Sequence, residues 1–158
     1  MIRPITQHDS SAVAALSVDA GLFPPEDIAF LEEMMVNYFS GNQANGHQCI
    51  IDEEHDALLG VAYYEPALAT DRTWYLTMIG VRRDLQGQGH GAALMQHVED
   101  SLKTDGQRIL LVETSGTPEF TLTRRFYVKL GYEEEARVRD YYAPSDDMVL
   151  FRKLLNSQ

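Results

Sequence analysis

Three glycines stand at alternate positions in the middle of the chain, in the stretch Gln86-Gly87-Gln88-Gly89-His90-Gly91. Because every second residue lacks a Cβ, the backbone can curl and turn consecutive N–H groups toward one point. A helix pattern follows over Ala92 to Thr104, and the free N–H groups at its start add the positive end of its dipole. Such an arrangement binds an anion, and a phosphate or pyrophosphate suits it best.

The segments on both sides of this glycine loop predict the elements that hold it. An apolar run from Trp74 to Val81 indicates a strand before the loop. Arg108 to Glu113 contains four successive apolar residues, as is typical of a parallel strand covered on both faces. Between them, the helix pattern ends before Gly106 and places four apolar side chains on one face: Leu94, Met95, Val98 and Leu102. We therefore expect a βαβ unit.

Two common nucleotide-binding loops fit this stretch poorly. A Walker-type loop needs Lys-Ser or Lys-Thr after its last glycine, whereas two alanines follow Gly91. The dinucleotide fingerprint is partly met by Gly87, Gly89 and Ala92, but it should directly follow the first strand of a parallel sheet. Here the glycines come after several strand patterns, with Arg82 to Gln86 inserted. A dinucleotide-dependent enzyme is therefore a distant hypothesis.

The loop and its flanks resemble the pyrophosphate loop of the GNAT superfamily of acyl-CoA N-acyltransferases. Met78-Ile79-Gly80-Val81 precedes the loop and Ala93-Leu94-Met95 follows it. A second segment, Arg125 to Tyr132, resembles the late helix of that family, which ends in Tyr-x-Lys-x-Gly-aromatic. The order of the expected elements agrees with the family over essentially the whole chain.

The resemblance implies acetyl-CoA as the co-substrate. Because none of the five histidines is spaced as a metal-binding pair, we expect no metal. The two neighbouring parallel strands would splay apart, and the pantetheine arm would bond the backbone of Ile79 and Val81. Backbone N–H groups near these residues would also hold the oxyanion. The resemblance further assigns the pyrophosphate to the N–H groups of the loop residues Gln86, Gly87, Gln88, Gly89, His90, Gly91 and Ala92.

Acetyl transfer to an amine requires a neutral amine, a stabilised oxyanion and a proton for the departing thiolate. Tyr127 matches the family position that approaches the coenzyme sulfur, so the resemblance makes its phenol the candidate acid and a coenzyme contact. The alternative is a core aromatic side chain that only lines the coenzyme channel.

Glu113 is the candidate base. It ends an apolar strand pattern, where we expect it to be partly buried, and its setting resembles the base position of the ribosomal-protein alanine acetyltransferases. The alternatives are a solvated carboxylate or an ion-pair partner of Arg124 or Arg125. Glu65 is a more distant candidate, and ordered water alone could also take the proton.

The acceptor amine should approach from the side opposite the coenzyme. The resemblance places there the second helix and its loop, with Phe23 and Glu26, and the final hairpin, with Tyr141 and Tyr142. Aromatic rings beside carboxylates suit a cationic substrate, although ordinary hairpin packing explains the two tyrosines equally well. A small amine and a peptide N-terminus both stay open as acceptors.

The chain departs from the family at two places. Phe120 stands where many relatives carry an Asn, seven residues before the tyrosine, so one polar contact to the coenzyme is missing or replaced. The segment Glu113 to Phe120 is also longer than in the ribosomal-protein enzymes, which weakens the transfer of their substrate class.

The remaining patterns complete an element order of β-α-α-β-β-β-α-β-α-β-β. We expect further strands over Met1 to Ile5, His47 to Asp52, Ala57 to Glu65, Tyr132 to Asp140 and Met148 to Leu154, and helices beginning near Asp9, Pro25 and Thr117. The predicted fold class is α+β, in three layers, with a mixed and mostly antiparallel sheet, a splayed parallel pair and about four helices. Cys49, the single cysteine, should be a buried thiol.

Length and composition limit the remaining possibilities. A chain of 158 residues suits one domain over 1–158. The net charge of −11 argues against nucleic acid and favours cationic partners such as amines. Without an apolar signal core or a membrane-length apolar run, we expect a cytoplasmic protein with no membrane partner. A homodimer stays open.

Three functional classes follow. The first is an acetyl-CoA-dependent N-acetyltransferase that uses direct transfer in a ternary complex. The second is a non-catalytic acyl-CoA-binding or regulatory module of the same fold, which would bind acetyl-CoA without acetylating any amine. The third is the dinucleotide-dependent enzyme, which would bind a nicotinamide dinucleotide better than coenzyme A.

Overall fold

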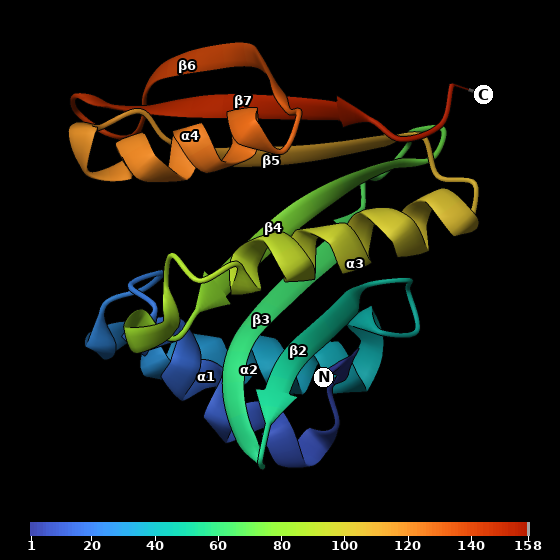
Figure 1. Cartoon of the computed structure of the whole chain (residues 1–158), viewed down its shortest axis with the longest axis vertical. Helices are drawn as coiled ribbons and strands as arrows, with labels where there is room; N and C mark the ends of the chain where they lie inside the picture. The colour runs from blue at the N-terminus through green and yellow to red at the C-terminus, as the bar shows by residue number, and fades with distance from the viewer. Residues whose placement is uncertain (158) are drawn as a thin grey trace. The chain divides into compact units, whose positions relative to one another are not determined.

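The computed structural model of the protein describes residues 1–157, and Figure 1 traces them. Within these residues seven strands and four α-helices follow one another in the predicted order. Their bounds are β1 Ile2–Pro4, α1 Ser10–Asp19, α2 Ile28–Asn37, β2 Gln48–Glu54, β3 Ala57–Pro66, β4 Thr73–Val81, α3 His90–Thr104, β5 Ile109–Ser115, α4 Thr121–Lys129, β6 Glu133–Ala143 and β7 Asp146–Leu154. Short 3₁₀ turns precede α1, α2, α3 and α4.

The strands form one mixed sheet in the order β1-β2-β3-β4-β5-β7-β6. All neighbours with a described register are antiparallel except β4 and β5, which pair in parallel between Thr73–Leu76 and Ile109–Val112. The predicted α+β class, the mixed sheet and the parallel pair are therefore confirmed. The paired register ends at Leu76, while β4 continues to Val81. The splay expected beyond that point stays a prediction.

By contacts, the chain divides into two compact units. The first comprises Met1–Pro66 and Thr77–Ser101, and the second comprises Ala67–Leu76 and the chain from Leu102 onward. The expected single domain over 1–158 stays a prediction, and each unit is described by itself below.

In the first unit, α1 and α2 cover one face of β2 and β3, and α3 covers the other (Figure 1). The strand period explains this arrangement, because Val61 and Tyr63 join the core under α1 and α2. Gly60 points to the other face, where a Cβ would lie only 2.8 Å from Leu94 Cδ1 of α3. Cys49 is buried in this core as predicted, and burial raises the pKa of its thiol to about 12.

In the second unit, β7 lies between β5 and β6 in the sheet order, and α4 packs on this group of strands (Figure 1). The contact is aromatic: the Tyr127 ring lies 5.6 Å from the Phe151 ring and 5.8 Å from the Tyr132 ring. Tyr127 is the buried residue of α4. Phe120 precedes the first full turn of α4 and is 36% exposed.

Candidate active site

The glycine loop lies between β4 and α3, as the sequence predicts. A 3₁₀ turn over Arg83–Leu85 follows β4, and α3 begins at His90, two residues earlier than expected. Gly87 and Gly89 adopt φ values of +78° and +91°, a region that favours glycine. An added Cβ at either position would meet no atom within 4 Å. Backbone conformation therefore requires these glycines, and the space beside them is open.

Gln86 ties this loop to the end of β4. Its Nε2 donates to the Val81 carbonyl oxygen at 3.0 Å and more weakly to the Ala20 carbonyl oxygen at 3.4 Å. The Val81 carbonyl, one of the backbone groups expected to meet pantetheine, thus already accepts a hydrogen bond. Ile79 and Val81 lie at the C-terminal end of β4, and both side chains are half-buried.

A buried carboxylate supports the start of α3. Asp52 on β2 is 7% exposed, and its Oδ2 lies 3.2 Å from Nδ1 of His90. Its Oδ1 accepts a hydrogen bond from the amino group of Met1 at 3.2 Å. Sequence reasoning did not find Asp52, because it lies 38 residues before His90. The contact anchors a predicted loop residue to the sheet.

Tyr127 in the second unit has the setting of a neutral phenol. Its side chain is 3% exposed, and three aromatic rings surround it, those of Phe126, Tyr132 and Phe151. Burial raises the pKa of its hydroxyl well above that of a free tyrosine, because the phenolate would lose its hydration. The group therefore stays protonated at neutral pH and can act as a proton donor.

Glu113 is exposed, so the expectation of partial burial is wrong. Leu110 and Val112 are buried, whereas Ile109 and Leu111, which share a face of β5 with Glu113, are only half-buried. Its Oε1 accepts a hydrogen bond from the hydroxyl of Tyr142 at 3.2 Å, which joins two of the predicted site residues. Partial burial and the adjacent Glu113 carboxylate raise the pKa of Tyr142. The hydroxyl therefore remains a donor to that carboxylate.

Tyr127 and Glu113 lie on opposite faces of the β5–β7 pair. Val112 pairs directly with Phe151, and Glu113 pairs with Leu150. Directly opposed residues share a face, and successive residues alternate between faces. Since Phe151 contacts Tyr127, Glu113 points to the face away from α4.

The remaining predicted residues belong to different parts of the chain. Tyr141 and Tyr142 lie on exposed β6 with their rings 5.0 Å apart. Phe23 and Glu26 belong to the first unit, immediately before α2, where the Phe23 ring lies 6.2 Å from Phe30. Glu65, the second base candidate, accepts a hydrogen bond from Thr77 at 3.0 Å within the first unit.

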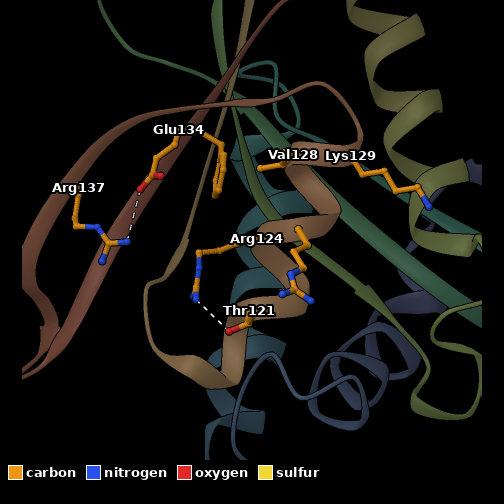
Figure 2. Close-up of a pocket in the computed structure, with 8 residues that line it drawn as sticks. Thr121, Arg124, Val128, Lys129, Glu134 and Arg137 are labelled. Carbon is orange, nitrogen blue, oxygen red and sulfur yellow. Dashed lines mark hydrogen bonds and ion pairs between the residues drawn. The ribbon is translucent and has the colours of Figure 1, made fainter.

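A hollow of about 360 Å³ in the second unit lies between α4 and β6 (Figure 2). None of the predicted site residues lines it. Figure 2 shows Arg124 and Arg137 reaching toward this hollow from the two elements, and Lys129 also lines it. Arg137 pairs with Asp147 at 3.0 Å and Glu134 at 3.6 Å. Arg124 binds the chain before α4, a role that no spacing in the sequence indicated.

Two further properties of residues 1–157 concern metal binding and membrane crossing. No group of three or more His, Cys, Asp or Glu side chains within them is arranged to hold a metal ion. No helix in that range is both long and apolar enough to cross a bilayer.

A family model described as the acetyltransferase (GNAT) family matches residues 16–132. The chain belongs to the GNAT acetyltransferase family. A solved GNAT-family protein from Desulfovibrio desulfuricans is 30% identical, with a TM-score of 0.91 and 98% of each chain covered. The family resemblance predicted from the two sequence motifs is therefore confirmed. No curated protein matches the sequence.

More distant solved structures share the GNAT fold. A ribosomal-protein-alanine N-acetyltransferase from Brucella melitensis is 18% identical, with a TM-score of 0.81 and coverage of 98% of this chain and 99% of the other. An aminoglycoside 6′-N-acetyltransferase complexed with coenzyme A is 15% identical, with a TM-score of 0.81 and coverage of 100% and 98%. At such identities the likeness concerns the fold alone.

Proposed function

We propose that this GNAT protein transfers the acetyl group of acetyl-CoA to a primary amine, directly and within a ternary complex. The observation that carries the proposal is the glycine loop at the start of α3. Gly87 and Gly89 hold left-handed backbone conformations beside open space, and a 15-residue helix follows directly. N–H groups at such a helix start bind phosphate well, and the coenzyme carries a pyrophosphate.

The donor site would consist mostly of backbone groups. The N–H groups of Gln86 to Ala92 would hold the pyrophosphate, and the backbone of Ile79 and Val81 would bind pantetheine. His90, anchored to Asp52 through Nδ1, keeps its Nε2 available for a polar contact. The proposed acetyl transfer uses no metal ion.

Two side chains would move the protons. The Glu113 carboxylate takes a proton from the acceptor ammonium, and the free amine attacks the thioester carbonyl carbon. The new C–N bond forms as the carbonyl becomes an oxyanion, which backbone N–H groups near Ile79 and Val81 stabilise. The attacking nitrogen then carries one proton more than the amide product, and it gives this proton to water. When the C–S bond breaks, the Tyr127 hydroxyl gives its proton to the coenzyme thiolate. Solvent then restores both groups.

The opposite-face arrangement within the second unit supports these separate roles. Tyr127 lies on the α4 face of β5 and β7, and Glu113 points to the other face with Tyr142. A base on one side and an acid on the other suit a reaction in which acceptor and coenzyme approach from opposite sides.

The acceptor would be cationic before it loses its proton. Glu113, Tyr141 and Tyr142 are the candidate acceptor residues of the second unit, and Phe23 and Glu26 are those of the first. The net charge of −11 favours the approach of such a substrate. The related folds include enzymes named for a ribosomal-protein alanine and for aminoglycosides, so both peptide N-termini and small amines belong in the acceptor set. We also infer a cytoplasmic location, which suits a chain whose single thiol is free.

Ligand titrations test the donor assignment. Acetyl-CoA and coenzyme A should raise the melting temperature in a concentration-dependent manner, and NAD should leave it unchanged. Stabilisation by NAD alone would refute the proposal. Stabilisation by acetyl-CoA without acetylation of any amine in a broad panel would instead support a non-catalytic acyl-CoA-binding module.

A further inference from the structure

Arg124 occupies an unfavourable place for a cation, near the positive N-terminal end of α4. This helix starts at Thr121 and carries Arg124, Arg125 and Lys129 but no acidic residue. Neither it nor the preceding 3₁₀ turn has a side-chain cap. A helix dipole disfavours positive charge at this end. A residue that breaks a local preference in this way requires a compensating contact.

Hydrogen bonds to the preceding loop provide that compensation. Nη1 of Arg124 donates to the carbonyl oxygens of Ser115 and Thr117, both at 2.8 Å. Its Nη2 donates to Oγ1 of Thr121 at 3.2 Å, the contact drawn in Figure 2. The planar guanidinium supplies several donors in fixed directions, which the single ammonium of lysine does not reproduce. Arg124 therefore binds α4 to the end of β5.

The other side of this loop is held independently of α4. Ser115 Oγ donates to Asp146 Oδ1 at 2.5 Å, and the Gly116 N–H donates to the Asp147 carbonyl oxygen at 2.8 Å. The β5–β7 ladder also reaches Ser115, which pairs with Met148. Loss of the Arg124 contacts should therefore leave β5 and β7 in place and loosen α4 against them.

We propose that Arg124 is a positioning residue that fixes Tyr127 relative to Glu113. Tyr127 follows Arg124 by three residues, about one helical turn, and Glu113 precedes Ser115 by two residues. This role rests on the proposed function, in which the two side chains serve one reaction. Misplacement of a reacting group by about 1 Å can lower the rate about 10²-fold.

The test compares Arg124→Gln with Arg125→Gln, which removes the same charge from an exposed neighbour on α4. Turnover is measured at saturating acetyl-CoA in the wild-type and Tyr127→Phe backgrounds. In the wild-type background, Arg124→Gln should lower kcat about 30-fold, which lies within the loss that misplacement of a reacting group causes. In the Tyr127→Phe background, the same change should lower kcat less than about 3-fold, because the effects of residues that act together are not additive. Arg125→Gln should leave kcat within about 3-fold in both. Equal losses from Arg124→Gln in the two backgrounds would overturn the role.

A second readout does not depend on activity. With fluorotyrosine incorporated, the Tyr127 resonance, assigned by its absence in Tyr127→Phe, should shift or broaden in Arg124→Gln and stay unchanged in Arg125→Gln. An unchanged resonance in both variants overturns the positioning role, even if the wild type proves inactive and the proposed function fails. If Arg124→Gln does not fold, Arg124→Lys replaces it, because lysine keeps the positive charge but lacks the planar set of guanidinium donors. The same comparisons then apply.

Discussion

Replacement of Tyr127 by Phe removes one hydroxyl from a side chain that is 3% exposed and leaves its ring contacts with Phe126, Tyr132 and Phe151 in place. Stability should change by less than about 1 kcal/mol, a few degrees in melting temperature. Loss of a general acid lowers the rate by about 10²-fold or more, which corresponds to about 2.7 kcal/mol of transition-state stabilisation. The effect should therefore concern catalysis and not folding.

The assay follows release of free coenzyme A thiol at saturating acetyl-CoA and amine. We expect kcat to fall about 10²-fold while the KM for acetyl-CoA changes little, because the phenol acts on the departing thiolate. Tyr132→Phe is the matched control, since it removes a hydroxyl from an equally buried ring 5.8 Å away. Unchanged turnover in Tyr127→Phe, or an equal loss in Tyr132→Phe, would refute the acid role.

The pH dependence adds a further check on the same residue. Burial raises the pKa of Tyr127, so the reactive protonated form persists above the pH at which a free tyrosine ionises, about 10. The kcat of the wild type should therefore show no loss attributable to this group between pH 8 and about 10. A basic limb in that range that disappears in Tyr127→Phe would contradict the buried, neutral phenol.

Three other changes have defined outcomes. Glu113→Gln should lower kcat about 10²-fold near neutral pH. If kcat of this variant still falls at low pH as it does in the wild type, water and not Glu113 is the base. Gly89→Ala strains a residue at φ +91°, so calorimetry should show acetyl-CoA binding weakened about 10-fold with little change for the amine. Asp9 has its pKa lowered from 3.8 to about 2, mainly by hydrogen bonds from Arg3, so its contribution to stability is complete above about pH 4 and is lost as the pH falls toward 2. As the pH falls from about 4 toward 2, the free energy of unfolding measured in urea should decrease less in Asp9→Asn than in the wild type.

The local sequence was sufficient to predict the fold and the position of the glycine loop. Alternate glycines between an apolar strand and an amphipathic helix identify the loop, because the required φ values favour one residue type. The bounds of β4, Thr73–Val81, agree within one residue with the strand predicted from Trp74 to Val81, because charged residues end the apolar run after Val81.

The site depends on contacts between residues far apart in the chain, and sequence patterns do not reveal these. The apolar run before Glu113 suggested partial burial, but Glu113 shares its face of β5 with Ile109 and Leu111, which are only half-buried. Asp52 and His90, which contact each other, lie 38 residues apart in the sequence. Arg124 donates to backbone carbonyl oxygens, which residues of every type carry. Hydrophobic periodicity and motif spacing carry no information on either contact.

The most direct measurement of the central claim combines acetyl-CoA with a panel of peptides bearing free N-termini and of small primary amines. Thiol release and the mass of each acceptor are recorded together. The account predicts at least one acceptor that gains one acetyl group on nitrogen, with one thiol released per acetyl group and both signals lost in parallel in Glu113→Gln and Tyr127→Phe. Thiol release with no acetylated acceptor, or acetylation that both variants retain in full, would contradict it.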